Sequence, residues 1–239
     1  MKTLNLVLLV LQMILSFTKL SEQSVKLIKT GSSNASHYIE LGIIVDNALY
    51  QKLDQEDDQV KKYCLDLVNE VNTYLHPINV SVHLVDVIIW KNQDEFPIPY
   101  NTIATLPNFQ NFVRTMNATK TQPDIVILLS GIRKLKTISV AYQGNICKQP
   151  PSAAIIQIKM GKSKQNVAAI VHKIGHILGA THDNECSCCV MSPSSTKWSD
   201  KAWSQGSLQE LVEKQELGLW KCLGNKPSQM YVEVDDICD

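Results

Sequence analysis

The sequence predicts one α/β domain, built on a mixed, mostly parallel sheet with flanking helices. Strand-like and helix-like segments alternate through the first two-thirds of the chain, which is the order expected when helices pack against a sheet. The segment Asp124 to Ser130 (DIVILLS) is a short, continuous apolar run, typical of a central strand. Apolar residues make up 44% of the 239 residues and charged residues 19%, as in ordinary globular domains.

The first half of the chain supplies two strands and two helices. Tyr38 to Val45 is rich in β-branched residues and predicts a strand. Gln55 to His76 carries apolar residues at helical spacing and is followed by Pro77, so it predicts an amphipathic helix that ends there. Ile78 to Trp90 alternates as a strand does, and Leu106 to Met116 predicts a second helix.

The second half continues the alternation. Ser139 to Tyr142 and Ala153 to Ile158 predict two further strands separated by a turn rich in Gly, Asn and Pro. Val167 to Leu178 predicts a helix with an apolar face, and Gly179 follows it as a stop signal. Gln205 to Leu217 predicts the last helix.

The N-terminus has the pattern of a targeting segment. Lys2 precedes an almost wholly apolar stretch from Leu4 to Phe17, which at about 14 residues is short for a membrane span and suits a signal peptide. We therefore expect a signal peptide over residues 1–20, a short leader rich in Ser, Lys and Gly over 21–37, and the folded domain over 38–239. A buried N-terminal helix is the weaker alternative, because polar residues flank the run. The mature protein is expected to be secreted and extracellular.

The charge and the cysteine content of the chain indicate which binding partners and which cellular compartment to expect. With 23 basic and 23 acidic side chains the formal net charge is zero, which does not favour binding to nucleic acid or to an anionic membrane. We expect a monomer whose partners are extracellular proteins or peptides. Glycosylation sequons begin at Asn34, Asn79 and Asn117. Seven cysteines in an exported chain imply disulfides, with at least one thiol left over.

Three histidines at a characteristic spacing indicate a metal site. His172 and His176 are four residues apart on a predicted helix, so both imidazoles project from one face. Gly179 can take the backbone conformation that reverses the chain and brings His182 to the same point. Three neutral imidazoles around an open fourth position form a catalytic zinc site.

The segment His172 to Asp183 resembles the metzincin metalloproteases, within them the adamalysin or reprolysin branch that includes venom metalloproteases. The family pattern is H-E-x-x-H-x-x-G-x-x-H-D followed by a methionine turn. This chain matches each fixed position except the glutamate, and Cys189 to Pro193 is similar to the methionine turn. The resemblance extends from Tyr38 to Pro227 and implies a metzincin-like catalytic domain with a small C-terminal subdomain.

The resemblance implies roles for individual residues. His172, His176 and His182 would bind one Zn²⁺, and Met191 would form the hydrophobic floor beneath it. Asp183 would support the site through hydrogen bonds. Residues 153–158 would be the sheet edge along which an extended peptide adds as a further strand.

The resemblance also implies a structural Ca²⁺ site and a disulfide. The calcium ligands would be Glu40, Asp124, the carbonyl of Cys222 and Asn225, which are hard oxygen donors. Cys147 would be linked to Cys222. The pairing of the other cysteines stays open, because Cys188 and Cys189 are adjacent and a family cysteine is missing near Lys201. The cysteines left unassigned are Cys64, Cys186, Cys188, Cys189 and Cys238.

Position 173 departs from the family pattern. In active members the glutamate there takes a proton from the zinc-bound water and delivers it to the leaving amine. Lys173 carries three donors and no acceptor when protonated. A unit charge about 5 Å from a dication also costs on the order of 6 kcal/mol at an effective dielectric of 20.

Three functions remain open at this point. The chain could be a zinc endopeptidase with another base, for which Glu185 is the nearest carboxylate in the sequence. It could be a non-catalytic exported protein that keeps the fold and binds peptides or proteins. It could be a scaffold without metal. We favour the impaired or inactive protein over the active peptidase.

Overall fold

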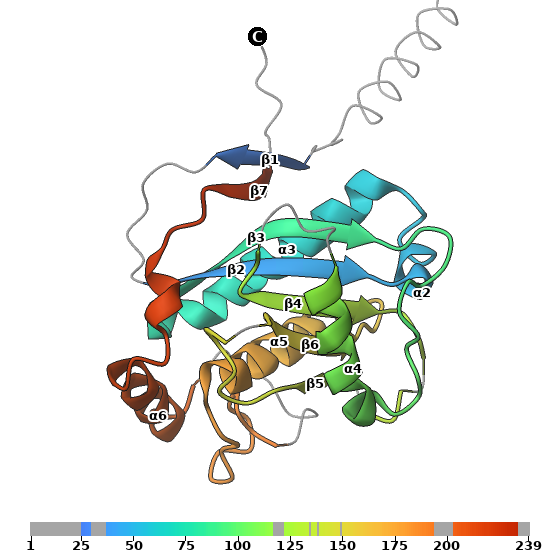
Figure 1. The fold of residues 1–239 in the computed structure, drawn as a ribbon. Coiled ribbons are helices and arrows are strands. Elements are labelled where there is room, and N and C mark those ends of the chain that lie inside the picture. Colours follow the sequence, from blue (N-terminus) through green and yellow to red (C-terminus); the bar gives the residue numbers. More distant parts are fainter. Residues whose placement is uncertain are drawn as a thin grey trace, which may run out of the picture.

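A computed structural model describes residues 25–29, 37–116, 122–133, 135–137, 139–148, 150–193 and 203–233. Its main sheet has five strands in the order β3-β2-β4-β6-β5, and a separate two-stranded sheet pairs β1 with β7 (Figure 1). The strands β2, β3, β4 and β6 run parallel, and β5 is antiparallel to β6, which confirms the predicted fold class. The strands are β1 (Val25–Lys29), β2 (His37–Val45), β3 (Val80–Ile89), β4 (Ile125–Ser130), β5 (Ser139–Ala141), β6 (Ser152–Gln157) and β7 (Gln229–Glu233).

Helices cover both faces of the main sheet (Figure 1). On one face, α3 and α5 pack on the side chains of Ile125, Ile127 and Leu129, and on the other, α4 packs on Val126 and Leu128. Burial on both faces explains why β4 is a continuous apolar run. The helices are α2 (Asn47–Tyr50), α3 (Asp57–Leu75), η1 (His76–Ile78), α4 (Thr102–Thr115), α5 (Ser163–Leu178), α6 (Gln205–Glu216) and η2 (Lys221–Gly224).

The helix α4 begins four residues earlier than the sequence predicts, and Pro107 lies inside it. A proline interrupts one backbone hydrogen bond and normally favours a helix boundary. Here the aromatic cluster around Phe109, Phe112 and Phe96 packs α4 against the sheet, with Trp90 beside it. This burial outweighs the lost hydrogen bond.

The predicted sheet edge is wrong. β6 is paired on both sides, because β5 folds back on it with Ser139 opposite Ile156 and Ala141 opposite Ala154. The edge strand is therefore β5, which has only three residues. The turn between the two strands, with Gly144 at a φ of 59°, allows the chain to reverse and cover the edge of β6.

The second sheet was not predicted. Part of the leader forms β1, which pairs antiparallel with β7 so that Val25 lies opposite Glu233 and Lys29 opposite Gln229. β7 also contacts the edge strand β3 of the main sheet. Residues 1–20 lie outside the described residues, as do Asn34, Asn117 and Cys238. No helix in the described part of the chain is long and apolar enough to cross a membrane.

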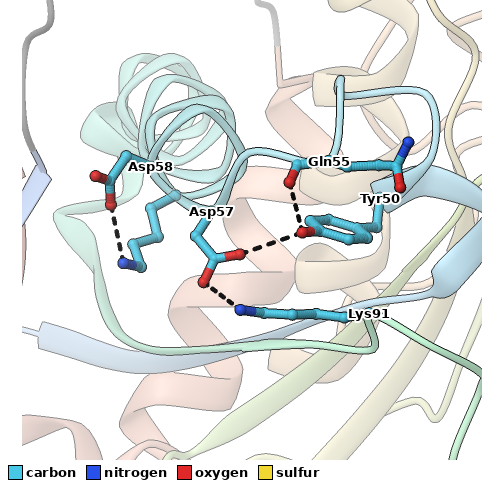
Figure 2. A network of polar contacts seen from close by, with 6 residues as sticks. Tyr50, Gln55, Asp57, Asp58 and Lys91 are labelled. Atoms are coloured by element: carbon cyan, nitrogen blue, oxygen red, sulfur yellow. Dashed lines mark hydrogen bonds and ion pairs between the residues drawn. The ribbon is translucent and has the colours of Figure 1, made fainter.

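The start of α3 is held by a polar network (Figure 2). Lys91 Nζ lies 2.6 Å from Asp57 Oδ2, and the hydroxyl of Tyr50 donates to the carbonyl oxygen of Gln55 at 2.5 Å. Lys61 pairs with Asp58 at 3.0 Å one turn along the helix. Asp57 and Asp58 occupy the first turn, where the helix dipole favours negative charge.

Candidate metal centre

The helix α5 and the turn after it position the three histidines. His172 and His176 lie on successive turns of α5, and the helix ends at Gly179, whose φ is +115°. The amide of Gly179 donates to the carbonyl oxygens of Gly175 and His176, which closes the last turn. A left-handed conformation of this kind suits glycine, and the reversed chain then brings His182 back to the two helical histidines.

The three imidazoles converge as the sequence predicts. Nε2 of His176 lies 3.1 Å from Nε2 of His182. The ring centroids are 4.6 Å apart for His172 and His176, 5.3 Å for His172 and His182, and 4.7 Å for His176 and His182. One nitrogen from each ring falls within 4.8 Å of the others.

Backbone carbonyls fix the orientation of two of the rings. Nδ1 of His172 lies 2.7 Å from the carbonyl oxygen of Val190, and Nδ1 of His176 lies 2.9 Å from that of Ala180. A carbonyl oxygen only accepts, so Nδ1 carries the proton and Nε2 presents its lone pair. Sequence patterns could not identify Val190 and Ala180 as orienting residues, because they act through backbone atoms that every residue possesses.

Burial keeps the histidines neutral. It lowers the pKa of His172 to about 3 and of His176 to about 4, with the charge of Lys173 adding to the effect. The pKa of the more exposed His182 is lowered by the same two causes. At neutral pH all three rings therefore hold free lone pairs, as metal ligands must.

This donor set fits zinc. Zinc–nitrogen bonds of about 2.0–2.1 Å at a tetrahedral angle place two ligand nitrogens about 3.3 Å apart. The 3.1 Å between His176 and His182 is close to that separation. Three imidazoles leave one tetrahedral position open, which is the arrangement of a catalytic zinc site.

Lys173 is the exceptional residue of the site. Its side chain is partly buried and, among the described residues, makes no hydrogen bond or ion pair. Burial lowers the pKa of its ammonium group to about 8. After burial, its charge is a further cause of the lowered pKa of His172, His176 and His182.

The methionine turn packs against the helix that carries the histidines. Met191 is fully buried, and its carbonyl oxygen accepts a hydrogen bond from the amide of Asp183 at 2.9 Å. Asp183 Oδ1 accepts from the amides of Glu185 and Cys186 at 2.9 and 3.1 Å, so Asp183 organises the loop after His182. Glu185 is exposed, and its side chain makes no hydrogen bond to the three histidines among the described residues.

The structure also pairs the cysteines. Cys147 and Cys222 form a disulfide, and so do Cys186 and Cys189. Of the described cysteines, Cys64 is a buried thiol and Cys188 an exposed one. The second bridge joins cysteines that are three residues apart, and Cys188 lies between them in the sequence.

The predicted calcium ligands come partly together. The amide of Glu40 donates to Asp124 Oδ2 at 2.9 Å, and η2, which holds Cys222, contacts β2, which holds Glu40. The pKa of Glu40 is raised by burial and then by the nearby charge of Asp124, and burial also raises the pKa of Asp124. Asn225 follows η2 and is exposed. Asn79 is exposed as well, with a φ of 56°.

This chain is similar to known proteins in sequence and in fold. The Reprolysin (M12B) family zinc metalloprotease pattern matches residues 37–227. A zinc metalloproteinase-disintegrin-like protein of Naja atra, kaouthiagin-like, is 29% identical over 218 residues, covering 84% of this chain and 37% of its own length. Snake venom metalloproteinase trimerelysin-2 of Protobothrops flavoviridis is 29% identical over 160 residues, covering 65% of this chain and 80% of its own.

A solved structure agrees in fold. Metalloproteinase-II of Bacteroides fragilis superposes with a TM-score of 0.55 at 19% identity, covering 82% of this chain and 59% of that one. The chain spans little more than a third of the length of the Naja atra relative. With the sheet, the converging histidines and the methionine turn in place, the chain belongs to the reprolysin (M12B) family of zinc metalloproteases.

Proposed function

We propose that this chain is a secreted, zinc-holding reprolysin-fold protein in which peptide hydrolysis is disabled by Lys173. The observation that carries the proposal is the residue beside the first ligand. It is an ammonium that makes no hydrogen bond or ion pair among the described residues, at the position where the metzincin pattern that the sequence resembles has its glutamate.

The chemistry of the side chains supports the loss of hydrolysis. When bound at the three rings, zinc supplies a Lewis acid with one coordination position left open. His172, His176 and His182 can hold it, but a protonated Lys173 has no lone pair with which to accept a proton. Loss of a general base typically slows such a reaction by about 10² to 10⁴-fold.

The same charge is expected to weaken metal binding. Lys173 repels a dication at the three histidines, while the ligand set itself is intact. We therefore expect one zinc per chain, bound more weakly than in a relative with glutamate at this position. The protein would then act by binding extracellular peptides or proteins without cleaving them.

Two further features belong to the proposal. Burial, and then the nearby charge of Asp124, raises the pKa of Glu40. A structural Ca²⁺ at Glu40, Asp124, the carbonyl of Cys222 and Asn225 would favour the charged form of both carboxylates. Secretion is supported by the apolar N-terminal stretch, by the two disulfides and by the venom origin of trimerelysin-2.

The deciding experiment compares the natural protein with Lys173→Glu. Zinc per chain is measured by elemental analysis and hydrolysis by release of peptides from denatured casein, with Lys173→Gln and Lys173→Glu/His176→Ala as controls. We expect cleavage only in Lys173→Glu. The absence of cleavage in Lys173→Gln would show that a general base is needed and that removal of the positive charge is not sufficient. Robust, chelator-sensitive cleavage by the natural protein would overturn the proposal. Absence of zinc from both proteins would overturn it in favour of a metal-free scaffold.

A further inference from the structure

A basic hollow lies at one end of the sheet, away from the histidines. Four of the eight residues that line it are cationic, namely Lys52, Arg133, Lys159 and Lys162, and its volume is about 400 Å³. The other four lining residues are uncharged, so no carboxylate lines the hollow among the described residues. We refer to this feature as the basic hollow.

The topology of the sheet creates the basic hollow. β4 and β6 are adjacent and parallel, so the segments that leave their carboxyl ends emerge at the same edge. The amide of Ile158 donates to the carbonyl oxygen of Ser130 at 2.7 Å, and Gln157 Nε2 donates to that of Ile132 at 2.5 Å. These bonds hold the segment of Arg133 beside the segment of Lys159 and Lys162.

Hydrogen bonds also hold the segment of Lys52 and the turn from Lys159 to Lys162 in place. Lys52, from the segment after α2, donates through Nζ to the carbonyl oxygen of Gly131. The buried side chain of Asn166 binds Lys159 twice, accepting from its amide and donating to its carbonyl oxygen, both at 3.0 Å. The turn from Lys159 to Lys162 is closed by a further backbone bond of 3.1 Å. The cations therefore project from a backbone that is already ordered, which lowers the entropic cost of binding.

The charges of the basic hollow are not neutralised within the protein. Arg133, Lys159 and Lys162 are exposed, and among the described residues none forms an ion pair. At the start of α3, by contrast, Lys61 and Lys91 each face a carboxylate (Figure 2). The carboxylate beside the turn, Glu70, accepts a hydrogen bond from Ser163 Oγ at 3.0 Å. Although the net charge of the chain is zero, the basic hollow has a local excess of positive charge.

We propose that the basic hollow binds a sulfated polysaccharide. Sulfate esters stay charged at all physiological pH values and recur along such a polymer, so one chain can meet cations from three separate segments. Sites for single-stranded nucleic acid combine cations with aromatic side chains for base stacking, and no aromatic residue lines the hollow among the described residues. Met160 is the one lining residue that is both apolar and strongly exposed, which is too little for insertion into a membrane.

The basic hollow and the metal centre lie at different ends of α5. His172 follows Ser163, the first residue of the helix, by nine positions, which corresponds to about 14 Å along the axis at 1.5 Å per residue. A polymer in the hollow would therefore leave the histidines accessible. This inference makes no use of zinc or of Lys173, so it stands or falls independently of the proposed loss of hydrolysis.

The test measures binding of the natural protein to heparin, used as the sulfated probe, by calorimetry in about 0.15 M salt. The test variant is Arg133→Ala/Lys159→Ala/Lys162→Ala. The control is Lys61→Ala/Lys62→Ala/Lys91→Ala, which removes the same charge from lysines that face carboxylates. We expect heparin affinity to fall at least tenfold in the test variant and less than twofold in the control, while thermal midpoints and zinc content stay unchanged in the test variant.

Three further probes complete the experiment. Desulfated heparin should not bind, since the contacts are to sulfate. Equal loss in both triple variants would overturn the inference by showing a response to net charge alone. Tighter binding of a single-stranded oligonucleotide, or of vesicles containing phosphatidylserine, with the same loss in the test variant, would overturn it in favour of those partners.

Discussion

A Cβ atom placed on Gly175 would lie 2.5 Å from Sδ of the buried Met191. It would also lie 3.2 Å from the ring of Trp203. The helix that carries His172 and His176 therefore contacts the methionine turn through the bare backbone of one glycine. The absence of a side chain at this point allows the two segments of the metal centre to approach.

We predict that Gly175→Ala lowers the free energy of unfolding by about 1–3 kcal/mol, the usual cost of overpacking. The matched control is Gly206→Ala on α6, where no heavy atom lies closer than 4.0 Å to the added Cβ. That change should raise stability by up to about 1 kcal/mol, because alanine is the better helix former. Chemical denaturation measures both. Equal stabilities of the two variants would contradict the close approach of Gly175 and Met191.

A second prediction concerns Asp46, which is fully buried. Its Oδ1 accepts from the amides of Leu49 and Gly131 at 2.6 and 2.9 Å, and its Oδ2 from the hydroxyl of Ser130 at 2.6 Å. Asp46→Ala leaves the amide of Gly131 and the hydroxyl of Ser130 without this acceptor, whereas the amide of Leu49 keeps its bond to the backbone carbonyl oxygen of position 46 at 3.1 Å. With two buried donors unsatisfied, the variant should lose about 3 kcal/mol. Asp46→Asn keeps an oxygen for both amides, and Ser130 can reverse its hydroxyl, so this variant should lose less than half as much. A similar loss in both variants would show that the negative charge itself matters.

A third prediction concerns the disulfide between Cys147 and Cys222. It closes a loop with a sequence separation of 75 residues, which corresponds to about 4 kcal/mol in the chain-entropy model. Cys147→Ser/Cys222→Ser should therefore unfold at a much lower denaturant concentration. The control is Cys186→Ser/Cys189→Ser, whose separation of 3 residues constrains the unfolded chain far less. Peptide mapping without reduction should recover the Cys147–Cys222 link, and free thiols at both positions would refute it.

A fourth prediction concerns the pH dependence of the metal-free protein. The pKa of His172 is lowered to about 3 and that of His176 to about 4, so between those values and about 6.5 the unfolded chain binds more protons than the folded one. Stability should be complete above pH 6.5 and fall progressively as the pH drops through 4. Thermal unfolding in a chelator measures this. His172→Asn keeps a donor near the carbonyl of Val190 but does not titrate, so its slope should be shallower; an unchanged slope would exclude His172 as the cause.

The sequence predicted those features that depend on periodicity and local spacing. The apolar run of Asp124 to Ser130 forms the expected strand, and the helix before Gly179 ends where it was expected, although it begins four residues earlier, at Ser163. The histidines converge for the same reason, since a four-residue spacing followed by glycine determines their geometry locally.

Features that depend on distant partners were missed. β1 and β7 are five-residue strands without a distinctive pattern, and they pair across about 200 residues of sequence. The edge of β6 was misassigned because residues 139–141 are too few to show that they cover it. The basic hollow joins cations from three segments, so total composition, with 23 charges of each sign, could not reveal it.

The pairing of β1 with β7 has a consequence for synthesis on the ribosome. Val25 lies opposite Glu233, so the first described strand finds its partner only after about 200 further residues have emerged. Until β7 has been made, the backbone N–H and C=O groups of β1 are available to the edge strands of other sheets, including those of neighbouring nascent chains. Contacts of such sequence separation form late and slowly. The order of synthesis thus allows this small sheet to form only after all strands of the main sheet have been made.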